Sequence, residues 1–349
     1  MKAQVLYGIN KLKYEKEYPL PKINDDTVLV KVKACGICGS DIDRVLKNGT
    51  YHFPTIIGHE FSGEVVDACS EEGKKWLKKR VTVFPLIPCK TCTSCLSGNY
   101  QLCEKYNYLG SRCDGAFAEF VAVPIWNLLE IPNDVSYEEA AMMEPLSVAM
   151  HTLRKVGNLL GKSVVITGSG AISSMLIQLA ECAGAKKIVL LARNDEKLDY
   201  IKKISPNIDV FNILRKNPIE KVQDLMDGGA AVVIEGTGAQ NMISYALQIV
   251  KRKGTIVLMG NPSDNVFLEK KNYWQILRKE IVLKGTWNSS YGILGKSDWE
   301  DVIELISNKR LNLMPLISHK ITLDKLLDGI LLMKNKTELS NKVMVVYEK

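Results

Sequence analysis

The stretch Val164-Val165-Ile166-Thr167-Gly168-Ser169-Gly170-Ala171-Ile172-Ser173 decides half of the fold of this 349-residue chain. Its first four residues are typical of a buried strand, and apolar residues at helical spacing then predict a helix over 171–183. Gly168 permits a tight turn, and Gly170 lets the backbone approach a pyrophosphate at the positive end of the helix. Ser173 replaces a third glycine and is still small. We therefore predict a dinucleotide-binding turn; the alternative is an ordinary strand–helix turn.

Strand-like and helix-like segments alternate on both sides of this turn. Such alternation is typical of a parallel, doubly wound sheet with helices packed against it. We therefore predict an α/β fold with a Rossmann domain over residues 147–286. Its expected strands lie at 162–167, 188–191, 231–235 and 255–259, and its expected helices at 171–183 and 196–203.

The rest of the chain has the texture of a second, mostly β domain. Within residues 1–146, Gly, Pro and Asp separate short β-patterned runs. The segment 287–349 is mixed and ends in a predicted strand at 342–346. A chain of 349 residues is long enough for two domains. The expected strands of the first domain lie at 28–33, 63–66, 80–84 and 117–123.

Four cysteines, Cys89, Cys92, Cys95 and Cys103, follow the spacing C-x2-C-x2-C-x7-C. Four thiolates so close in the sequence can surround one zinc ion tetrahedrally without any other ligand. Such a site is full, and we therefore expect it to be structural. The alternatives are buried thiols or two disulfides, but two CxxC steps before a fourth cysteine favour zinc.

Composition excludes several classes of protein. No apolar run reaches the roughly 20 residues needed to span a bilayer, and we expect no signal peptide. Nine cysteines, four of them assigned to metal, suit a reducing cytoplasm. The net charge of +7 is spread out, and the basic run at 74–80 predicts a solvated face rather than a nucleic-acid site. We expect a cytoplasmic protein whose partner is a small molecule.

The acidic residue that usually binds the ribose 2′-hydroxyl, about 20 positions after the glycine turn, is missing. The predicted strand ends in Leu191-Ala192-Arg193-Asn194 instead. Without a carboxylate there, a 2′-phosphate is not repelled, and Arg193 could pair with one. We predict a preference for NADP(H) over NAD(H), with Lys197 as a further cofactor-binding residue. The alternative is that Arg193 is a surface charge and that Asp195 binds the ribose.

A second set of zinc-binding residue types is scattered along the first domain. It consists of Cys38, His59, Glu60 and Glu144, and thiolate, imidazole and carboxylate groups are all good zinc ligands. Each residue alone has an ordinary explanation, such as a core thiol or a charge at a helix end. Together with the four cysteines and the dinucleotide turn, the set predicts a catalytic zinc site with an open position.

Over essentially its whole length, the chain resembles the zinc-dependent medium-chain alcohol/polyol dehydrogenase family. Several stretches carry this resemblance in addition to the turn at 168–173. They are Cys38-Gly39-Ser40-Asp41, Gly58-His59-Glu60-Phe61-Ser62-Gly63, the four-cysteine segment, Asp114-Gly115-Ala116-Phe117-Ala118-Glu119 and Glu144-Pro145.

The resemblance implies that Cys38, His59 and Glu144 hold a catalytic zinc, with Glu60 close by as an exchangeable ligand or a neighbouring group. It also implies that Asp41 orients His59 through the second ring nitrogen. The zinc would act as a Lewis acid while a hydride passes between substrate and nicotinamide.

The resemblance further implies a GroES-like domain that contains both zinc sites and is formed by 1–146 together with 287–349. In this family Ser40 would bind the substrate hydroxyl and begin the path of its proton to solvent. The next relay position, often histidine, is Asp43 here, which departs from the family pattern. Relatives are dimers or tetramers, so we expect a homodimer or homotetramer.

Further runs resemble the branch of the family that oxidises galactitol 1-phosphate. The implied substrate is a secondary alcohol of a polyol phosphate, which would give a ketose phosphate. Candidates for binding its phosphate are Arg112, Lys47 and Arg44. The alternatives are a sorbitol-, butanediol- or threonine-type dehydrogenase, a zinc-free quinone reductase relative, or a zinc-stabilised binding protein with a vestigial site. The runs are Lys47-Asn48-Gly49, Tyr108-Leu109-Gly110-Ser111-Arg112, Ile276-Leu277-Arg278-Lys279-Glu280, Gly285-Thr286-Trp287 and Trp299-Glu300.

Overall fold

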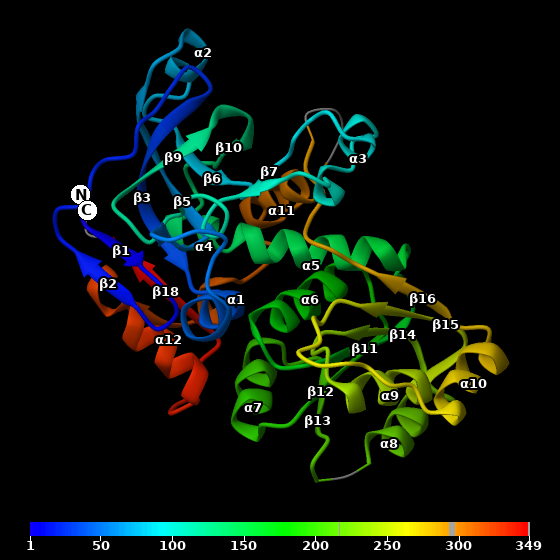
Figure 1. Cartoon of the computed structure of the whole chain (residues 1–349). Coiled ribbons are helices and arrows are strands. Elements are labelled where there is room, and N and C mark those ends of the chain that lie inside the picture. Colours follow the sequence, from blue (N-terminus) through cyan, green and yellow to red (C-terminus); the bar gives the residue numbers. More distant parts are fainter. Residues whose placement is uncertain (216, 293–296, 348–349) are drawn as a thin grey trace. The chain divides into compact units, whose positions relative to one another are not determined.

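The computed structural model describes residues 1–215, 217–292 and 297–347 (Figure 1). The chain forms two compact units. The first comprises Met1–Ser147 and Ser290–Lys349, and the second comprises Val148–Ser289. Within the described ranges, no helix combines the length and the apolar character that a membrane crossing requires.

The second unit contains a six-stranded, entirely parallel sheet. The strand order is β13-β12-β11-β14-β15-β16, with β11 near the middle. Successive strands are added on one side of β11 as far as β13 and then on its other side from β14 to β16, as in a doubly wound fold. The predicted Rossmann sheet is therefore confirmed. The strands are β11 (Ser163–Thr167), β12 (Lys187–Ala192), β13 (Asp209–Asn212), β14 (Ala230–Glu235), β15 (Val250–Leu258) and β16 (Val282–Gly285).

Helices pack against this sheet, α6 and α7 against β11 to β13, and α9 and α10 against β14 and β15 (Figure 1). Val165, Val189 and Val233, from three adjacent strands, are fully buried in the core beneath them. β15 begins five residues before the predicted strand at 255–259, and α6 ends one residue before the predicted end. The helices are α6 (Ala171–Cys182), α7 (Asp195–Ile204), α8 (Pro218–Leu225), α9 (Gln240–Ile249) and α10 (Lys270–Lys279).

The first unit is built on a seven-stranded sheet with the path β10-β6-β5-β3-β18-β17, and β9 also pairs with β3. A three-stranded sheet, β2-β1-β4, packs with it around a shared apolar core. The prediction of a strand over 117–123 is wrong for 117–119. Phe117 bonds to Gln4 of β1 and to Ile57, and Glu119 bonds to Lys2 and to Val32 of β3, whereas the regular pairing with β3 begins at Phe120 and ends at Pro124. The strands of the large sheet are β3 (Thr27–Gly36), β5 (Glu60–Ala68), β6 (Arg80–Val83), β9 (Phe120–Pro124), β10 (Leu128–Glu130), β17 (Ile317–Ile321) and β18 (Lys342–Val346).

The smaller elements of the first unit matter because several of them carry candidate site residues. A two-stranded sheet pairs β7 with β8. Helix α5 begins in the first unit and continues into the second. The remaining elements are β1 (Ala3–Leu6), β2 (Leu12–Glu15), β4 (Thr55–Ile56), β7 (Leu86–Ile87), β8 (Asn107–Tyr108), α1 (Gly39–Asp43), α2 (Glu71–Lys74), α3 (Thr93–Leu96), α4 (Tyr137–Ala141), α5 (Met143–Val156), α11 (Asp298–Ser307) and α12 (Leu326–Asn335).

Candidate active site and metal centres

Strand pairing brings the first group of candidate ligands together. Gly36, at the end of β3, lies opposite Glu60 at the start of β5. Cys38 follows β3 by two residues and His59 precedes β5 by one, so both leave the sheet at the same end. The antiparallel register thus places residues about twenty positions apart in one small region.

Cys38, His59 and Glu60 each offer one ligand atom, and these three atoms all lie within 4.8 Å of one another. His59 and Glu60 are buried, whereas Cys38 is partly exposed. Sulfur, imidazole nitrogen and carboxylate oxygen form a donor set that fits zinc. Three of the four predicted catalytic-site ligands are therefore grouped, and Glu60 rather than Glu144 supplies the carboxylate of this group.

Residues of the first helical turn hold the imidazole of His59. Asp41 Oδ1 lies 3.5 Å from His59 Nδ1, and Arg44 donates to the same carboxylate at 2.9 Å. The backbone N–H of Cys38 donates to the other Asp41 oxygen at 3.0 Å. Burial opposes the charge on Asp41, but His59 and Arg44 bring its pKa below the ordinary value. Because Asp41 lies at Nδ1, Nε2 of His59 is the nitrogen left for a metal.

The hydroxyl of Ser40 has a defined orientation, because Arg44 Nη1 donates to Ser40 Oγ at 2.9 Å. Ser40 therefore accepts a hydrogen bond there and keeps its own proton for another acceptor. Asp43 points to a different partner, the Lys47 ammonium at 3.2 Å, with both side chains exposed. Arg44 thus connects the predicted substrate-binding serine to the residue that orients His59.

The carboxylate of Glu60 has a second neighbour that the sequence did not suggest. Lys342, the first residue of β18, donates to Glu60 at 2.5 Å and to the carbonyl of Ile37 at 3.3 Å. β18 pairs with β3 so that Met344 lies opposite Gly36, which brings Lys342 to the same end of the sheet. A Cβ on Gly36 would clash with the Glu60 carboxylate.

Glu144 lies on the first turn of α5 and is buried. Tyr108 donates from its hydroxyl to Glu144 Oε1 at 3.2 Å, and its ring lies edge-on to the ring of His59, with centroids 5.7 Å apart. Burial raises the pKa of Glu144 to about 7, and the neighbouring charge of Glu60 adds to this shift. Glu144 is therefore close to the group of three, and the hydroxyl of Tyr108 is its hydrogen-bond partner.

The four cysteines of the loop around α3 form a separate group, in which all four sulfur atoms lie within 4.8 Å of one another. Cys89 and Cys95 are 4.0 Å apart, as are Cys92 and Cys103. These separations rule out disulfides, whose sulfur atoms lie about 2 Å apart, and are close to the roughly 3.8 Å between ligands of a tetrahedral zinc–sulfur site. Hydrogen bonds from Thr91, and then from the backbone N–H of Cys92, lower the pKa of Cys89 to about 5.

The predicted dinucleotide turn connects β11 to α6. Gly168 has φ of +93°, a conformation that side chains rarely adopt. Gly170 precedes the helix with no side-chain cap, and a Cβ added to it would meet no atom within 4 Å. Ser173 is buried, and its hydroxyl would lie 3.5 Å from a Cβ on Gly168. Open space above uncapped N–H groups is what a pyrophosphate requires.

At the end of β12, Arg193 is exposed, and no residue in the described ranges accepts a hydrogen bond from its side chain. Asp195, the alternative ribose ligand, pairs with Arg215 at 2.6 Å. Asn194 caps α7 by accepting from the backbone N–H of Lys197 at 2.9 Å.

Two family models match the chain. The model described as Alcohol dehydrogenase GroES-like domain matches residues 24–133, and the model described as Zinc-binding dehydrogenase matches residues 171–308. Galactitol 1-phosphate 5-dehydrogenase of Escherichia coli strain K12 is 32% identical over 306 residues, which are 87% of this chain and 88% of the relative. The chain belongs to the zinc-binding medium-chain dehydrogenase family.

Other relatives and solved structures agree. L-threonine 3-dehydrogenase of Bacillus velezensis is 31% identical over 328 residues, 91% of each chain. The crystal structure of Escherichia coli galactitol-1-phosphate dehydrogenase has a TM-score of 0.90 and 30% identity, covering 99% of this chain and 100% of that one. A zinc-binding dehydrogenase of Sinorhizobium meliloti 1021 bound to NADP has a TM-score of 0.91 and 29% identity, covering 99% of each. The predicted family, its galactitol-1-phosphate branch as a close relative, and the GroES-like plus Rossmann architecture are confirmed.

As a member of this family, the dehydrogenase is a zinc- and NAD(P)-dependent oxidoreductase that acts on a small molecule. Its three predicted phosphate-binding cations differ in their surroundings. Arg44 is committed to Asp41 and Ser40, and Lys47 pairs with Asp43. Only Arg112 has its guanidinium against aromatic rings, those of Tyr51 and Tyr106.

Sequence reasoning missed two residues of this dehydrogenase's site, Tyr108 and Lys342. Lys342 had a usable signal, because a lysine that begins the otherwise apolar run Lys342–Val346 must find a partner if the strand is buried. Tyr108 had no such signal beyond its place in a run that resembles the family.

The basic segment 74–80 forms a solvated face, as predicted, since Lys74 and Lys75 pair with exposed glutamates of α2.

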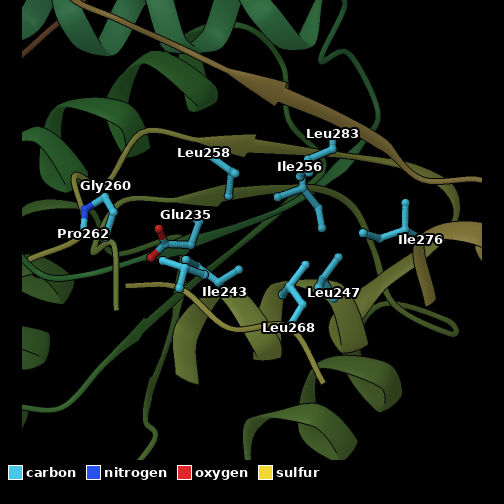
Figure 2. A pocket seen from close by; sticks show the side chains of 11 residues that line it. Glu235, Ile243, Leu247, Ile256, Leu258, Gly260, Pro262, Leu268, Ile276 and Leu283 are labelled. Atoms are coloured by element: carbon cyan, nitrogen blue, oxygen red, sulfur yellow. The ribbon is translucent and has the colours of Figure 1, made fainter. Parts of the chain in front are cut away.

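The second unit of the dehydrogenase contains a cavity of about 290 Å³, lined mostly by apolar side chains of α9, β15, α10, β16 and the segment 260–268 (Figure 2). Glu235, the one charged residue in its wall, is fully buried and accepts from Thr167, Thr237 and Gly238. The cavity therefore offers apolar contact rather than hydrogen bonds.

Proposed function

We propose that this dehydrogenase oxidises a secondary alcohol of a polyol phosphate, such as galactitol 1-phosphate, to a ketose phosphate with NADP⁺ as hydride acceptor. The observation that carries the proposal is the grouping of Cys38, His59 and Glu60 beside the oriented hydroxyl of Ser40. A metal-ligand group next to a proton-donating hydroxyl, in a chain that also has a dinucleotide turn, is suited to alcohol–ketone chemistry.

The donor set fits zinc. Cys38, His59 and Glu144 would hold the ion, with Glu60 as an exchangeable carboxylate, and the four cysteines would hold a second, structural ion. When bound, the catalytic ion would supply Lewis-acid polarisation of the substrate oxygen. The fit rests on the mutually close ligand atoms of Cys38, His59 and Glu60, on the buried carboxyl group of Glu144 near them, and on the Nδ1 contact that leaves Nε2 of His59 for a metal.

Residues of α1 would transfer the proton of the substrate hydroxyl. Ser40 Oγ accepts from Arg44, so its proton can move to solvent-side acceptors while Ser40 takes up the proton of the substrate hydroxyl. Asp41 and His59 would keep their relative orientation throughout, because Arg44 balances the charge of the buried Asp41 carboxylate. The positive charge of Arg44 also favours a substrate oxygen that has lost its proton.

The environment of Arg193 supports NADP(H). Its guanidinium is exposed and free of partners within the described ranges, while Asp195 is already paired with Arg215. An aspartate held by an arginine at 2.6 Å is a poor candidate for a ribose 2′-hydroxyl, whereas a free guanidinium suits a 2′-phosphate. Gly168, Gly170 and Ser173 would receive the pyrophosphate, and Lys197 lies on the first turn of the next helix.

Two observations support a homodimer. β16 is an edge strand of the parallel sheet, and all four of its residues are exposed, including Val282 and Leu283. Val266 and Leu268 are also exposed and line the apolar cavity of Figure 2 together with Leu283. An exposed apolar edge strand favours pairing, and β16 of a second copy could extend the sheet across a two-fold axis.

The proposed function is tested by a kinetic panel that crosses NADP⁺ and NAD⁺ with four alcohols. These are galactitol 1-phosphate, galactitol, 2,3-butanediol and L-threonine. The expected result is the highest kcat/KM with galactitol 1-phosphate and NADP⁺. A higher kcat/KM with L-threonine would favour the second candidate, a threonine-type dehydrogenase, to which the 31% identity with L-threonine 3-dehydrogenase points.

A further inference from the structure

Arg112 is held in place by aromatic rings. Its guanidinium carbon lies 3.9 Å from the ring centroid of Tyr51 and 4.5 Å from that of Tyr106. Two hydrogen bonds to backbone carbonyls connect the surrounding loops. One runs from Tyr51 N–H to the Ser111 carbonyl at 3.3 Å, and the other joins the His52 ring to the Arg112 carbonyl at 3.2 Å. A guanidinium stacked on tyrosines has lost most of its rotational freedom before any ligand arrives.

This guanidinium has no anionic partner. In the part of the chain that the structure describes, no carboxylate or carbonyl accepts a hydrogen bond from it, and its Nε is buried without any partner. Arg44 and Arg80, by contrast, donate to a carboxylate and to backbone carbonyls. A fixed cation with unused N–H donors is suited to binding an oxyanion, because hydrogen bonds from such donors are strongest when the acceptor is charged.

A series of ring contacts connects the cation to the candidate metal ligands. The ring of Tyr106 packs edge-on against that of Tyr108 at 6.3 Å, and Tyr108 packs edge-on against His59 at 5.7 Å. Two aromatic rings therefore separate Arg112 from the imidazole of the ligand group. A ligand that reaches both Arg112 and this group would have its anionic group at one end and its reacting carbon several bonds away.

We propose that Arg112 binds the phosphate of the substrate through the paired N–H groups of its guanidinium, with Tyr51 and Tyr106 holding it in position. This inference rests on the proposed polyol-phosphate substrate and names the residue that selects it. Lys47 and Arg44 are not required for this role, because each already has a carboxylate partner. An uncharged polyol would gain nothing from Arg112.

The test compares the wild-type enzyme with Arg112→Met, Arg112→Lys and the control Lys47→Met. For each, kcat/KM is measured with galactitol 1-phosphate and with galactitol, and inorganic phosphate is titrated as an inhibitor of galactitol oxidation. Arg112→Met should lose about 100-fold in kcat/KM for the phosphorylated polyol, chiefly through KM. Arg112→Met should keep its rate with galactitol and should no longer be inhibited by phosphate. Arg112→Lys should recover part of the kcat/KM for the phosphorylated polyol and part of the inhibition by phosphate. Lys47→Met should leave both quantities at their wild-type values. Circular dichroism and zinc content verify that each variant is folded.

The outcomes separate this inference from the proposed function. If the wild type prefers galactitol 1-phosphate and Arg112→Met retains that preference, the assignment of Arg112 is overturned while the proposed function stands. If the wild type shows no preference for the phosphorylated polyol, the proposed substrate is wrong. In that case, inhibition by inorganic phosphate that disappears in Arg112→Met still establishes the anion site. Loss of L-threonine oxidation in the same variant would assign the site to a carboxylate and overturn the phosphate.

Discussion

The ammonium of Lys342 donates to the carboxylate of Glu60 at 2.5 Å, and both side chains are buried. Glu60 also belongs to the group of three candidate metal ligands. An ion bound at Cys38 and His59 would therefore compete with the lysine on β18 for one carboxylate. The balance between them decides whether Glu60 is a ligand or a neighbour of the metal.

Removing the lysine should both destabilise the fold and change this balance. In Lys342→Met, the free energy of unfolding of the metal-free protein should fall by about 3–5 kcal/mol, because a buried carboxylate is left unpaired. Urea denaturation measures it. In the cobalt-substituted enzyme, the visible spectrum should shift as Glu60 joins the metal. Lys342→Arg should preserve both properties, and Lys342→Met with Glu60→Gln should recover most of the lost stability. Equal losses in the single and double variants would contradict the pairing.

The candidate catalytic site should be separable from the four-cysteine site by counting metal. Cys38→Ala should bind about one zinc ion per chain where the wild type binds about two, as measured by atomic emission. Turnover should disappear, while binding of the dinucleotide, followed by fluorescence, stays within about twofold because the turn at 168–173 lies in the other unit. Retention of two ions in this variant would show that Cys38 is not a ligand.

The four-cysteine site should affect the stability of the fold rather than the catalytic rate. Cys92→Ser removes one of four sulfur ligands, and the expected result is loss of one zinc ion and a lower unfolding temperature. At temperatures where the variant is folded, kcat should stay within a fewfold of the wild type. The exposed Cys69 offers a matched control, since Cys69→Ser should leave metal content and unfolding temperature unchanged. An unchanged zinc count in Cys92→Ser would refute the structural-site assignment.

Cofactor choice should depend on Arg193. Arg193→Ser should reduce kcat/KM for NADP⁺ by about 10- to 100-fold, because a charge-assisted hydrogen bond to the 2′-phosphate is lost. The value for NAD⁺ should be unchanged or slightly higher. Lys203→Ser, another exposed cation on the following helix, controls for loss of general positive charge. A wild type that prefers NAD⁺, together with an inert Arg193→Ser, would favour the alternative in which Asp195 binds the ribose.

The edge strand β16 should determine the oligomeric state. Leu283→Lys places a charge on the exposed apolar edge, and the expected result is a shift from dimer to monomer in analytical ultracentrifugation. Leu160→Lys alters an exposed leucine elsewhere in the second unit and should leave the mass unchanged. A dimer that persists in Leu283→Lys would place the interface on another surface.

Local sequence patterns predicted the elements whose geometry is local. The turn Gly168–Ser173 requires only a strand, two glycines and a helix, and the four cysteines require only one loop, so spacing was enough for both. The same reasoning could not choose between Glu60 and Glu144 as the carboxylate nearest Cys38 and His59. That choice depends on the pairing of Gly36 with Glu60 in β5 and on the hydroxyl of Tyr108, neither of which leaves a periodic signal.

Contacts over long sequence separations were the least predictable. Lys342 and Glu60 are 282 residues apart, and they meet because β18 and β5 both pair with β3. The surroundings of Arg112 were equally hidden, because Tyr51 and Tyr106 come from separate loops. A candidate list of cations could be written from the sequence, but which cation lacks a counter-ion depends on side-chain placement.

The position of Lys342 has a consequence for biosynthesis. A ribosome adds about 5–20 residues each second. Lys342 is therefore translated on the order of 15 to 60 seconds after Glu60. During that interval the nascent chain already contains Cys38, His59 and an uncompensated Glu60. A metal ion that binds during this interval could be coordinated by all three groups without competition from Lys342. Metal that binds during translation and metal that binds afterwards would therefore begin with different sets of ligands.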